Sequence, residues 1–238
     1  MYGIRFNGKH SYHDMGFTMP FEGREIGFPA KNKITVTVPF SNEEYDFSEL
    51  YGGQSYGSRT LKYNFNLYKR GNWSHTAMEF EKIRLINWLM DSNGRQRLED
   101  DDIPGYYFLA EVEDAASIQD DFETGTLSVT FRAYPFKISD KAEGDDIWDT
   151  FNFETDVVQY VHFTVDTTQD IVLYNVGPSQ VSPKITTTAP MQIVKDGITY
   201  TIDIGETESE DFVLMHGENP MTINGTGDIL FTFYKELI

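Results

Sequence analysis

Three consecutive aspartates, Asp100, Asp101 and Asp102, form the densest acidic cluster of the chain. Carboxylate oxygens are ligands of hard divalent cations, so this cluster is a candidate metal site. Its spacing matches no calcium-binding loop, and no histidine lies near it in the sequence. Charged runs of this kind are usually solvated turns. We therefore expect a turn before Ile103-Pro104-Gly105 rather than a metal centre.

The other side chains that could perform catalysis form no known motif. The five histidines are His10, His13, His75, His162 and His216. None belongs to an HExxH motif, no serine lies in a GxSxG elbow, and no GxxxxGKS/T phosphate-binding loop is present. Cysteine is absent, which excludes disulfides and thiolate chemistry. The sequence predicts no catalytic residue, no cofactor and no metal, so we expect a protein that is not an enzyme.

The sequence leaves open a role in binding or hydrolysing carbohydrate. Two of the 38 Asp and Glu residues could face each other as in glycoside hydrolases, but so many acids make such a pairing uninformative. Trp148 and Tyr174 could stack on a sugar ring, as could Tyr160 and Tyr200. The alternative, which we favour, is that these aromatic rings lie in a core or an interface.

Composition and charge limit the fold class and the possible functions of the protein further. The 238 residues allow one large or two small domains, and 15% of them are aromatic, which favours half-buried β-structure. The formal net charge is −19, with −6 in residues 1–140 and −13 in residues 141–238. Binding of nucleic acid through phosphates needs clustered cations and is not expected. The acidity is either a solvated surface or the wall of a conduit along which DNA slides.

The chain also lacks targeting signals. The first ten residues have no apolar signal-peptide core, and no apolar run is long enough to span a bilayer. We therefore expect a protein that is made in the cytoplasm, stays soluble and does not bind membranes.

The first half of the sequence predicts strands around one helix. Residues 34–38 are a β-branched run that ends at Pro39, and residues 61–68 alternate apolar and polar side chains. Between them, residues 40–58 predict a long loop or projecting hairpin. A helix over residues 76–91 is expected to begin with a capping box at Thr76-Ala-Met-Glu79 and to end at Asn93-Gly94.

The apolar face of this helix should cover a sheet. Ile83, Ile86 and Met90 are at helical spacing, and Leu85 and Leu89 lie beside them.

The second half predicts β-structure throughout. Strands over residues 106–113 and 127–133 read as a hairpin, and the charged stretch 139–149 is the best candidate for a domain boundary. Lys195-Asp-Gly197 and Asn224-Gly225 are hairpin-turn signals. About seven short strands are expected beyond the boundary, which indicates a β-sandwich or jelly roll. They cover residues 157–165, 171–176, 184–188, 191–194, 198–204, 212–215 and 229–234.

Exposed aromatic residues mark a candidate subunit interface. These residues lie among Gly, Ser and Glu, and large aromatic side chains provide much of the binding energy of interfaces. The set is Tyr45, Phe47, Leu50, Tyr51 and Tyr56. The alternative, that they fold back on their own domain, has equal weight.

The order of these pieces resembles the distal tail proteins of long-tailed bacteriophages over roughly residues 30–138. Phe40 stands where that family often has glycine. The matching pieces are Val38-Pro39-Phe40, Tyr45-Asp46-Phe47-Ser48, the strand 61–68, Trp88-Leu89, Leu98, Asp102, Pro104-Gly105-Tyr106-Tyr107, Phe131 and Tyr134-Pro135-Phe136.

The resemblance implies a mainly β protein with two domains. Residues 1–140 would form a ring-forming β-sandwich with one α-helix and a projecting hairpin. Residues 141–238 would form a galectin-like β-sandwich, or jelly roll, although the last strand (229–237) could instead return to the first domain.

The resemblance also implies a structural virion protein at the tail tip, assembled in the host cytoplasm. Six copies would form a ring that joins the tail tube protein to the tail-tip adhesin or tail-associated lysin, sometimes with receptor-binding proteins around it. DNA would pass through without being bound. The alternative function is a carbohydrate-binding adhesion module that recognises the bacterial cell wall, and a cell-wall enzyme is the weakest hypothesis.

Overall fold

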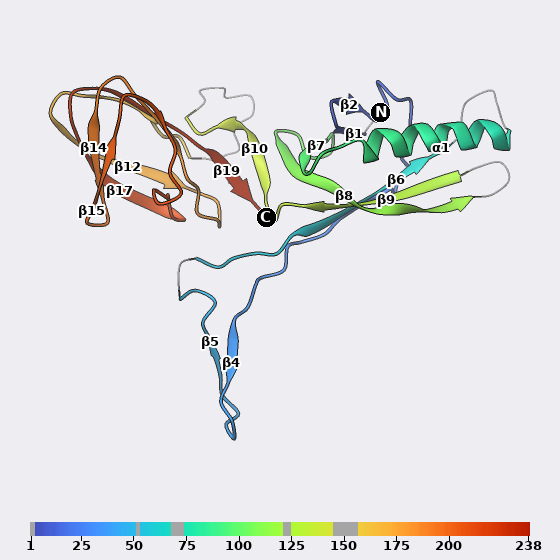
Figure 1. The fold of residues 1–238 in the computed structure, drawn as a ribbon, viewed down its shortest axis with the longest axis horizontal. Coiled ribbons are helices and arrows are strands. Elements are labelled where there is room, and N and C mark those ends of the chain that lie inside the picture. The colour runs from blue at the N-terminus through green and yellow to red at the C-terminus, as the bar shows by residue number, and fades with distance from the viewer. Residues whose placement is uncertain (1–2, 51–52, 68–73, 121–124, 145–156) are drawn as a thin grey trace. The chain divides into compact units, whose positions relative to one another are not determined.

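The computed structural model describes residues 3–50, 53–67, 74–120, 125–144 and 157–238, and in these residues the chain is mainly β with one α-helix (Figure 1). The chain divides into two compact units. The first contains Met1–Asn32, Tyr56–Lys137 and Ile238, and the second contains Lys33–Ser55 and Ile138–Leu237.

The first unit is built on seven antiparallel strands in the order β2-β1-β7-β8-β9-β6-β3. The strands are β1 (Ile4–Phe6), β2 (Lys9–His10), β3 (Arg24–Ile26), β6 (Arg59–Asn66), β7 (Gln96–Asp100), β8 (Tyr106–Asp120) and β9 (Gly125–Ala133). The predicted strands at residues 106–113 and 127–133 are confirmed, with β8 longer than expected, and the one predicted at 61–68 is confirmed over residues 61–66, with residue 68 outside the described residues.

This sheet folds over on itself. β7 and β8 separate β1 from β9 in the sheet order, which would place β1 and β9 about 14 Å apart if the sheet were flat. Yet the ring centroids of Phe6 on β1 and Phe131 on β9 are 5.1 Å apart. The register of β8 against β9 shifts between Val112 and Asp114 and again before Ser117, and such bulges bend a strand. The two halves of the sheet therefore enclose one core.

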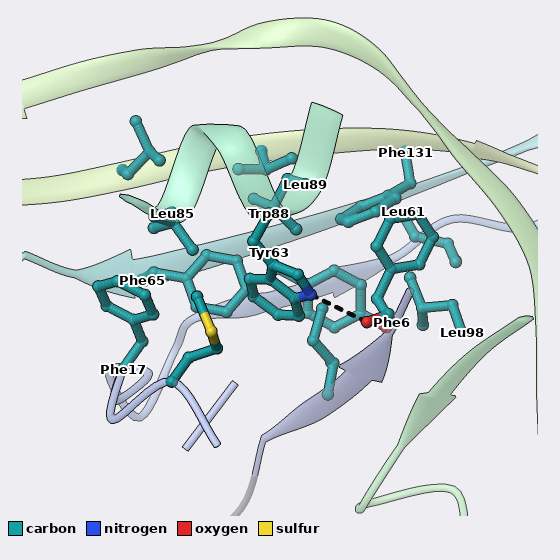
Figure 2. Packing of buried hydrophobic residues seen from close by; sticks show 14 of the residues in the cluster. Phe6, Phe17, Leu61, Tyr63, Phe65, Leu85, Trp88, Leu89, Leu98 and Phe131 are labelled. Carbon is teal, nitrogen blue, oxygen red and sulfur yellow. Dashed lines mark hydrogen bonds between the residues drawn. The ribbon is translucent and has the colours of Figure 1, made fainter. Parts of the chain in front are cut away.

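Helix α1 (His75–Met90) closes that core. Its buried side presents Leu85, Trp88 and Leu89, and the Trp88 indole Nε1 donates a hydrogen bond of 3.0 Å to the Phe6 carbonyl oxygen (Figure 2). Because this bond is buried, it satisfies the only polar atom of the indole and fixes α1 against β1.

Two details of the helix differ from the sequence expectation. The N-cap is Ser74, whose hydroxyl accepts from the Ala77 amide at 3.2 Å, so the predicted capping box at Thr76 is wrong by two residues. Ile83 and Met90 are 53% and 52% exposed, so their predicted place on the buried face is also wrong. The helix carries apolar residues on two sides, and periodicity alone does not tell which side the sheet covers.

The second unit contains two four-stranded antiparallel sheets that share one core, as in a β-sandwich. One has the order β11-β18-β13-β16 and the other β12-β17-β14-β15. Their bounds are β11 (His162–Val165), β12 (Thr168–Asn175), β13 (Lys184–Thr187), β14 (Met191–Lys195), β15 (Ile198–Ile202), β16 (Gly205–Thr207), β17 (Gly217–Asn224) and β18 (Gly227–Thr232). β10 (Lys137–Ala142) pairs with β19 (Tyr234–Leu237).

Turn chemistry explains both the accurate and the wrong expectations in this unit. Asp196 and Gly197 have φ values of 53° and 78°, and they join β14 to β15, so the predicted Asp-Gly hairpin is confirmed. Asn224-Gly225 instead links β17 to β18 in different sheets, so its predicted hairpin is wrong.

Strand β17, which contains Pro220, was not predicted from the sequence. β14 pairs only with residues 222–224 of β17, so Pro220 lies where the strand has one neighbour.

Among the described residues, no helix has both the length and the apolar character needed to cross a membrane.

Leu89→Ala should lower the free energy of unfolding by about 2–5 kcal/mol, because it leaves a cavity between α1 and the sheet. Ile83→Ala is the matched control on the same helix, and we expect a change within about 0.5 kcal/mol because that side chain is half exposed. Denaturant unfolding followed by circular dichroism measures both. Equal losses for the two variants would contradict the orientation of the helix.

Candidate subunit interface

The hairpin formed by β4 (Thr35–Thr37) and β5 (Glu44–Asp46) is a separate two-stranded sheet. Its register pairs Thr35 with Asp46, Val36 with Tyr45 and Thr37 with Glu44. The Phe47 amide extends the ladder by donating to the Ile34 carbonyl at 2.8 Å. A hairpin of two strands is marginally stable by itself in water, so contacts of its faces decide its stability.

Strand alternation divides this ribbon into two unlike faces. One face carries Thr35, Thr37, Glu44 and Asp46. The other, called here the apolar face of the hairpin, consists of Ile34, Val36, Val38, Tyr45 and Phe47. All five are exposed, from 39% for Val38 to 60% for Ile34, and none belongs to either hydrophobic core. Contiguous exposed apolar side chains of this kind mark interaction surfaces.

The tip of the hairpin holds a strained aromatic residue. The Ser41 amide donates to the Val38 carbonyl at 3.1 Å, which closes a turn with Pro39 and Phe40 at its centre. Phe40 has a φ of 65° and is fully exposed. Left-handed backbone costs a residue with a Cβ roughly 1–2 kcal/mol, which is why such positions favour glycine. The position of the Phe40 ring at the tip therefore requires a backbone conformation that is locally unfavourable in free energy.

Polar contacts fix the base of the hairpin. Lys33 Nζ lies 2.6 Å from Asp46 Oδ2, and the Ser48 hydroxyl accepts from the Ile34 amide at 2.8 Å. The Asp46 carboxylate also accepts from the Ser48 amide at 2.9 Å. The hydrogen bond from Lys33 is the main reason that the pKa of Asp46 lies well below its usual range, with Ser48 adding to the effect. The polar face therefore holds the ribbon in register while the apolar face stays uncovered.

The other predicted interface residues lie outside this ribbon. Leu50 is 61% exposed, and its amide donates to the Phe47 carbonyl at 3.1 Å. Tyr56 is half-buried, with its ring centroid 5.2 Å from that of Phe136 in the same unit. Tyr51 is not among the described residues. The structure thus groups Tyr45 and Phe47 on one face, with ring centroids 6.5 Å apart, and directs Tyr56 toward its own unit.

The candidate glycan residues are only partly placed. Tyr174 is on β12, and its hydroxyl donates to a Glu218 carboxylate oxygen, which raises the pKa of the tyrosine. Trp148 lies outside the described residues, so the predicted pair remains a prediction. Tyr160 is 84% exposed, whereas the Tyr200 ring packs 5.0 Å from Phe212.

The aspartate cluster makes internal contacts in the first unit. Asp100 is buried and accepts from the Tyr63 hydroxyl at 3.0 Å and from Arg24 Nε at 3.1 Å. Burial raises the pKa of Asp100, and Arg24 and Tyr63 oppose that rise.

The neighbouring aspartates also make contacts within the first unit. Asp102 also pairs with Arg24, and Asp101 Oδ2 lies 3.1 Å from His10 Nε2. No group of three or more His, Asp or Glu side chains in the described parts of the chain is arranged to hold a metal ion.

A second apolar surface was missed by the sequence reading. The exposed side of α1 presents Phe80, Ile83 and Met90, with Asn87 between them, and this set is called here the outer stripe of α1. Phe80 is 67% exposed. The signal was available in the sequence, because residues 80, 83, 87 and 90 repeat at helical spacing.

Charge is distributed unevenly between the parts. The first unit has 14 Lys and Arg against 16 Asp and Glu, a net of −2. Residues 33–55, which include the hairpin, have 1 against 4, a net of −3. Residues 138–237 have 4 against 18, a net of −14. The acidity therefore lies mainly in the second unit, which includes the hairpin.

The fold described above is shared with a solved structure of a phage protein. The chain matches the crystal structure of the Dit protein of phage SPP1, described as a paradigm of the hub adsorption apparatus in phages that infect Gram-positive bacteria. The match covers 100% of both chains with a TM-score of 0.65 and 14% sequence identity, so it shows a common fold. No protein-family model matches the chain, and none of the curated proteins is significantly similar to it.

Phe40→Gly should leave the stability of the monomer unchanged or raise it by up to about 1 kcal/mol, because glycine adopts positive φ without the steric cost of a Cβ. The same change should weaken self-association if the exposed ring is a contact residue. Thermal unfolding and sedimentation velocity measure the two effects separately. Pro39→Ala, which keeps the ring, is the matched control. A Phe40→Gly protein that assembles like wild type would show that the ring makes no intermolecular contact.

Proposed function

We propose that this protein is a distal tail hub of a long-tailed bacteriophage, a structural component that assembles into a ring at the tail tip. The apolar face of the hairpin carries the proposal, because a hydrophobic ribbon left uncovered in the monomer gains stability when another chain covers it. The similarity of fold to the SPP1 hub protein over the whole chain supports the same role.

The ring would contain six copies, as the resemblance to distal tail proteins implies. Its neighbours would be the tail tube protein on one side and the tail-tip adhesin or tail-associated lysin on the other, with receptor-binding proteins at the rim in some phages. Assembly would take place in the host cytoplasm, and the finished position is the virion tail. A hub of this kind needs no catalytic residues, and its function rests on contacts between subunits.

The charge of the chain suits a channel through which DNA passes. A wall rich in Lys and Arg would release counterions from the duplex and hold it, and each additional phosphate contact would strengthen that hold. A net of −2 in the first unit and −14 in residues 138–237 offers no general attraction for phosphate. We propose that the channel wall is neutral to acidic, so that the genome moves without being bound.

Replacing Val36, Tyr45 and Phe47 with Ser should leave the monomer folded and weaken assembly, because the substitutions remove three apolar side chains from the exposed face. The matched control is Thr35→Ser with Thr37→Ser, which changes the opposite face of the same strands. Mass in solution over a concentration series and negative-stain images report ring formation. If the triple variant forms rings as readily as the control does, the hairpin is not the assembly element.

Purified protein should not bind duplex DNA measurably at roughly physiological salt, since its formal net charge of −19 repels phosphate. Fluorescence anisotropy of a labelled duplex, titrated with monomer and with assembled protein, is the measurement. Tight binding under these conditions, or a ring structure with a lumen rich in Lys and Arg, would overturn the conduit argument and leave the ring itself standing.

A further inference from the structure

We infer that the outer stripe of α1 is the surface that receives the apolar face of the hairpin from a neighbouring copy of this chain. The inference rests on the proposed ring function and names the two surfaces that meet where one copy contacts the next. It concerns Phe80, Ile83 and Met90 on one copy and Ile34, Val36, Val38, Tyr45 and Phe47 on the next.

A ring requires two unlike surfaces on each copy. When a surface binds the same surface on a second copy, the contact is isologous and closes as a dimer, whereas a contact between different surfaces repeats around a ring. Two hairpins that met face to face would therefore stop at two copies. The hairpin needs a different apolar partner, and the outer stripe of α1 is an exposed apolar surface of another kind on the same chain.

The lengths of the two surfaces agree. Ile34 and Val38 are four residues apart on an extended strand, which spans about 13 Å at 3.3 Å per residue. Phe80 and Met90 are ten residues apart on a helix, which spans about 15 Å at 1.5 Å per residue. A strand pair laid along the helix would therefore cover the whole stripe, with Val36 near its middle, where Ile83 and Asn87 lie.

Charge favours this receiver over the second unit. The segment that contains the hairpin has a net of −3, and residues 138–237 have a net of −14, so docking of the hairpin there brings like charges together. Helix α1 has two acids and two bases, a net of zero. Its bases are Lys82 and Arg84, next to Ile83, and the Arg84 side chain is 43% exposed.

The absence of cysteine from the chain allows a direct test. Two single-cysteine proteins, Val36→Cys and Ile83→Cys, are mixed with different mass tags and oxidised mildly. Two controls are matched: Thr37→Cys places the thiol on the polar face of the hairpin, and Ile198→Cys places it on an exposed apolar site of the second unit. The mixed Val36–Ile83 disulfide should form faster than Thr37–Ile83 or Val36–Ile198 by about tenfold or more, the ratio given by about 1.4 kcal/mol of preference.

A second variant tests the same contact without disulfide cross-linking. Ile83→Asp changes an exposed residue, so the monomer should keep its unfolding temperature, and the ring should be lost because a carboxylate would enter the acidic, apolar contact. Ile198→Asp is the matched control and should assemble normally.

The possible outcomes separate this inference from the proposed function. Rings that form normally with Ile83→Asp and give no Val36–Ile83 disulfide would overturn the helix as receiver and leave the hub proposal intact. Predominant Val36–Val36 disulfides would show an isologous contact and overturn both. A Val36–Ile83 disulfide that forms within one doubly substituted chain at high dilution, and not between chains, would overturn the inference by placing the contact inside the monomer.

Discussion

A two-stranded ribbon has two faces and no sheet behind it, and this constraint governs the interpretation of the whole protein. The polar face of the hairpin is fixed by Lys33, Asp46 and Ser48, so the ribbon keeps its register without help from a core. The opposite face, centred on Val36 and Tyr45, remains in water. Hydrophobic burial is the main favourable term in folding and association, so a surface that covered this face would add to the stability of the protein.

The first unit completes its own core without the hairpin. Its folded sheet brings Phe6 against Phe131, and the buried hydrogen bond from Trp88 to the Phe6 carbonyl holds α1 in place. Once Leu85, Trp88 and Leu89 face the sheet, the helical period directs Phe80 and Ile83 outward. The outer stripe of α1 is therefore a consequence of how the core packs.

Sequence patterns predicted the elements more reliably than the surroundings of their side chains. The strict alternation in residues 61–68 and the Asp-Gly turn at 196–197 are local signals, and both were read correctly. The buried side of α1 was read wrongly for Ile83 and Met90, because the helix has apolar residues on two sides and periodicity does not tell which side the sheet covers. Strand β17 was not predicted because it contains Pro220. Proline is tolerated at this position because that part of β17 lacks a neighbouring strand on one side, which the sequence does not show. The β-branched run at residues 34–38 was correctly expected to be a strand, but it was not recognised as the first arm of the hairpin, which was expected within residues 40–58.

The distribution of charge fits a division of tasks between the two units. A net of −14 in residues 138–237 produces long-range repulsion between equivalent parts of neighbouring copies, so those residues add to solubility rather than to attraction. The first unit, with a net of −2, can approach its own copy at little electrostatic cost. Close contact between copies is therefore least unfavourable through the first unit and the apolar ribbon. Exposed apolar surface and a net charge of zero therefore coincide on α1, and this coincidence is the reason for proposing it as an association surface.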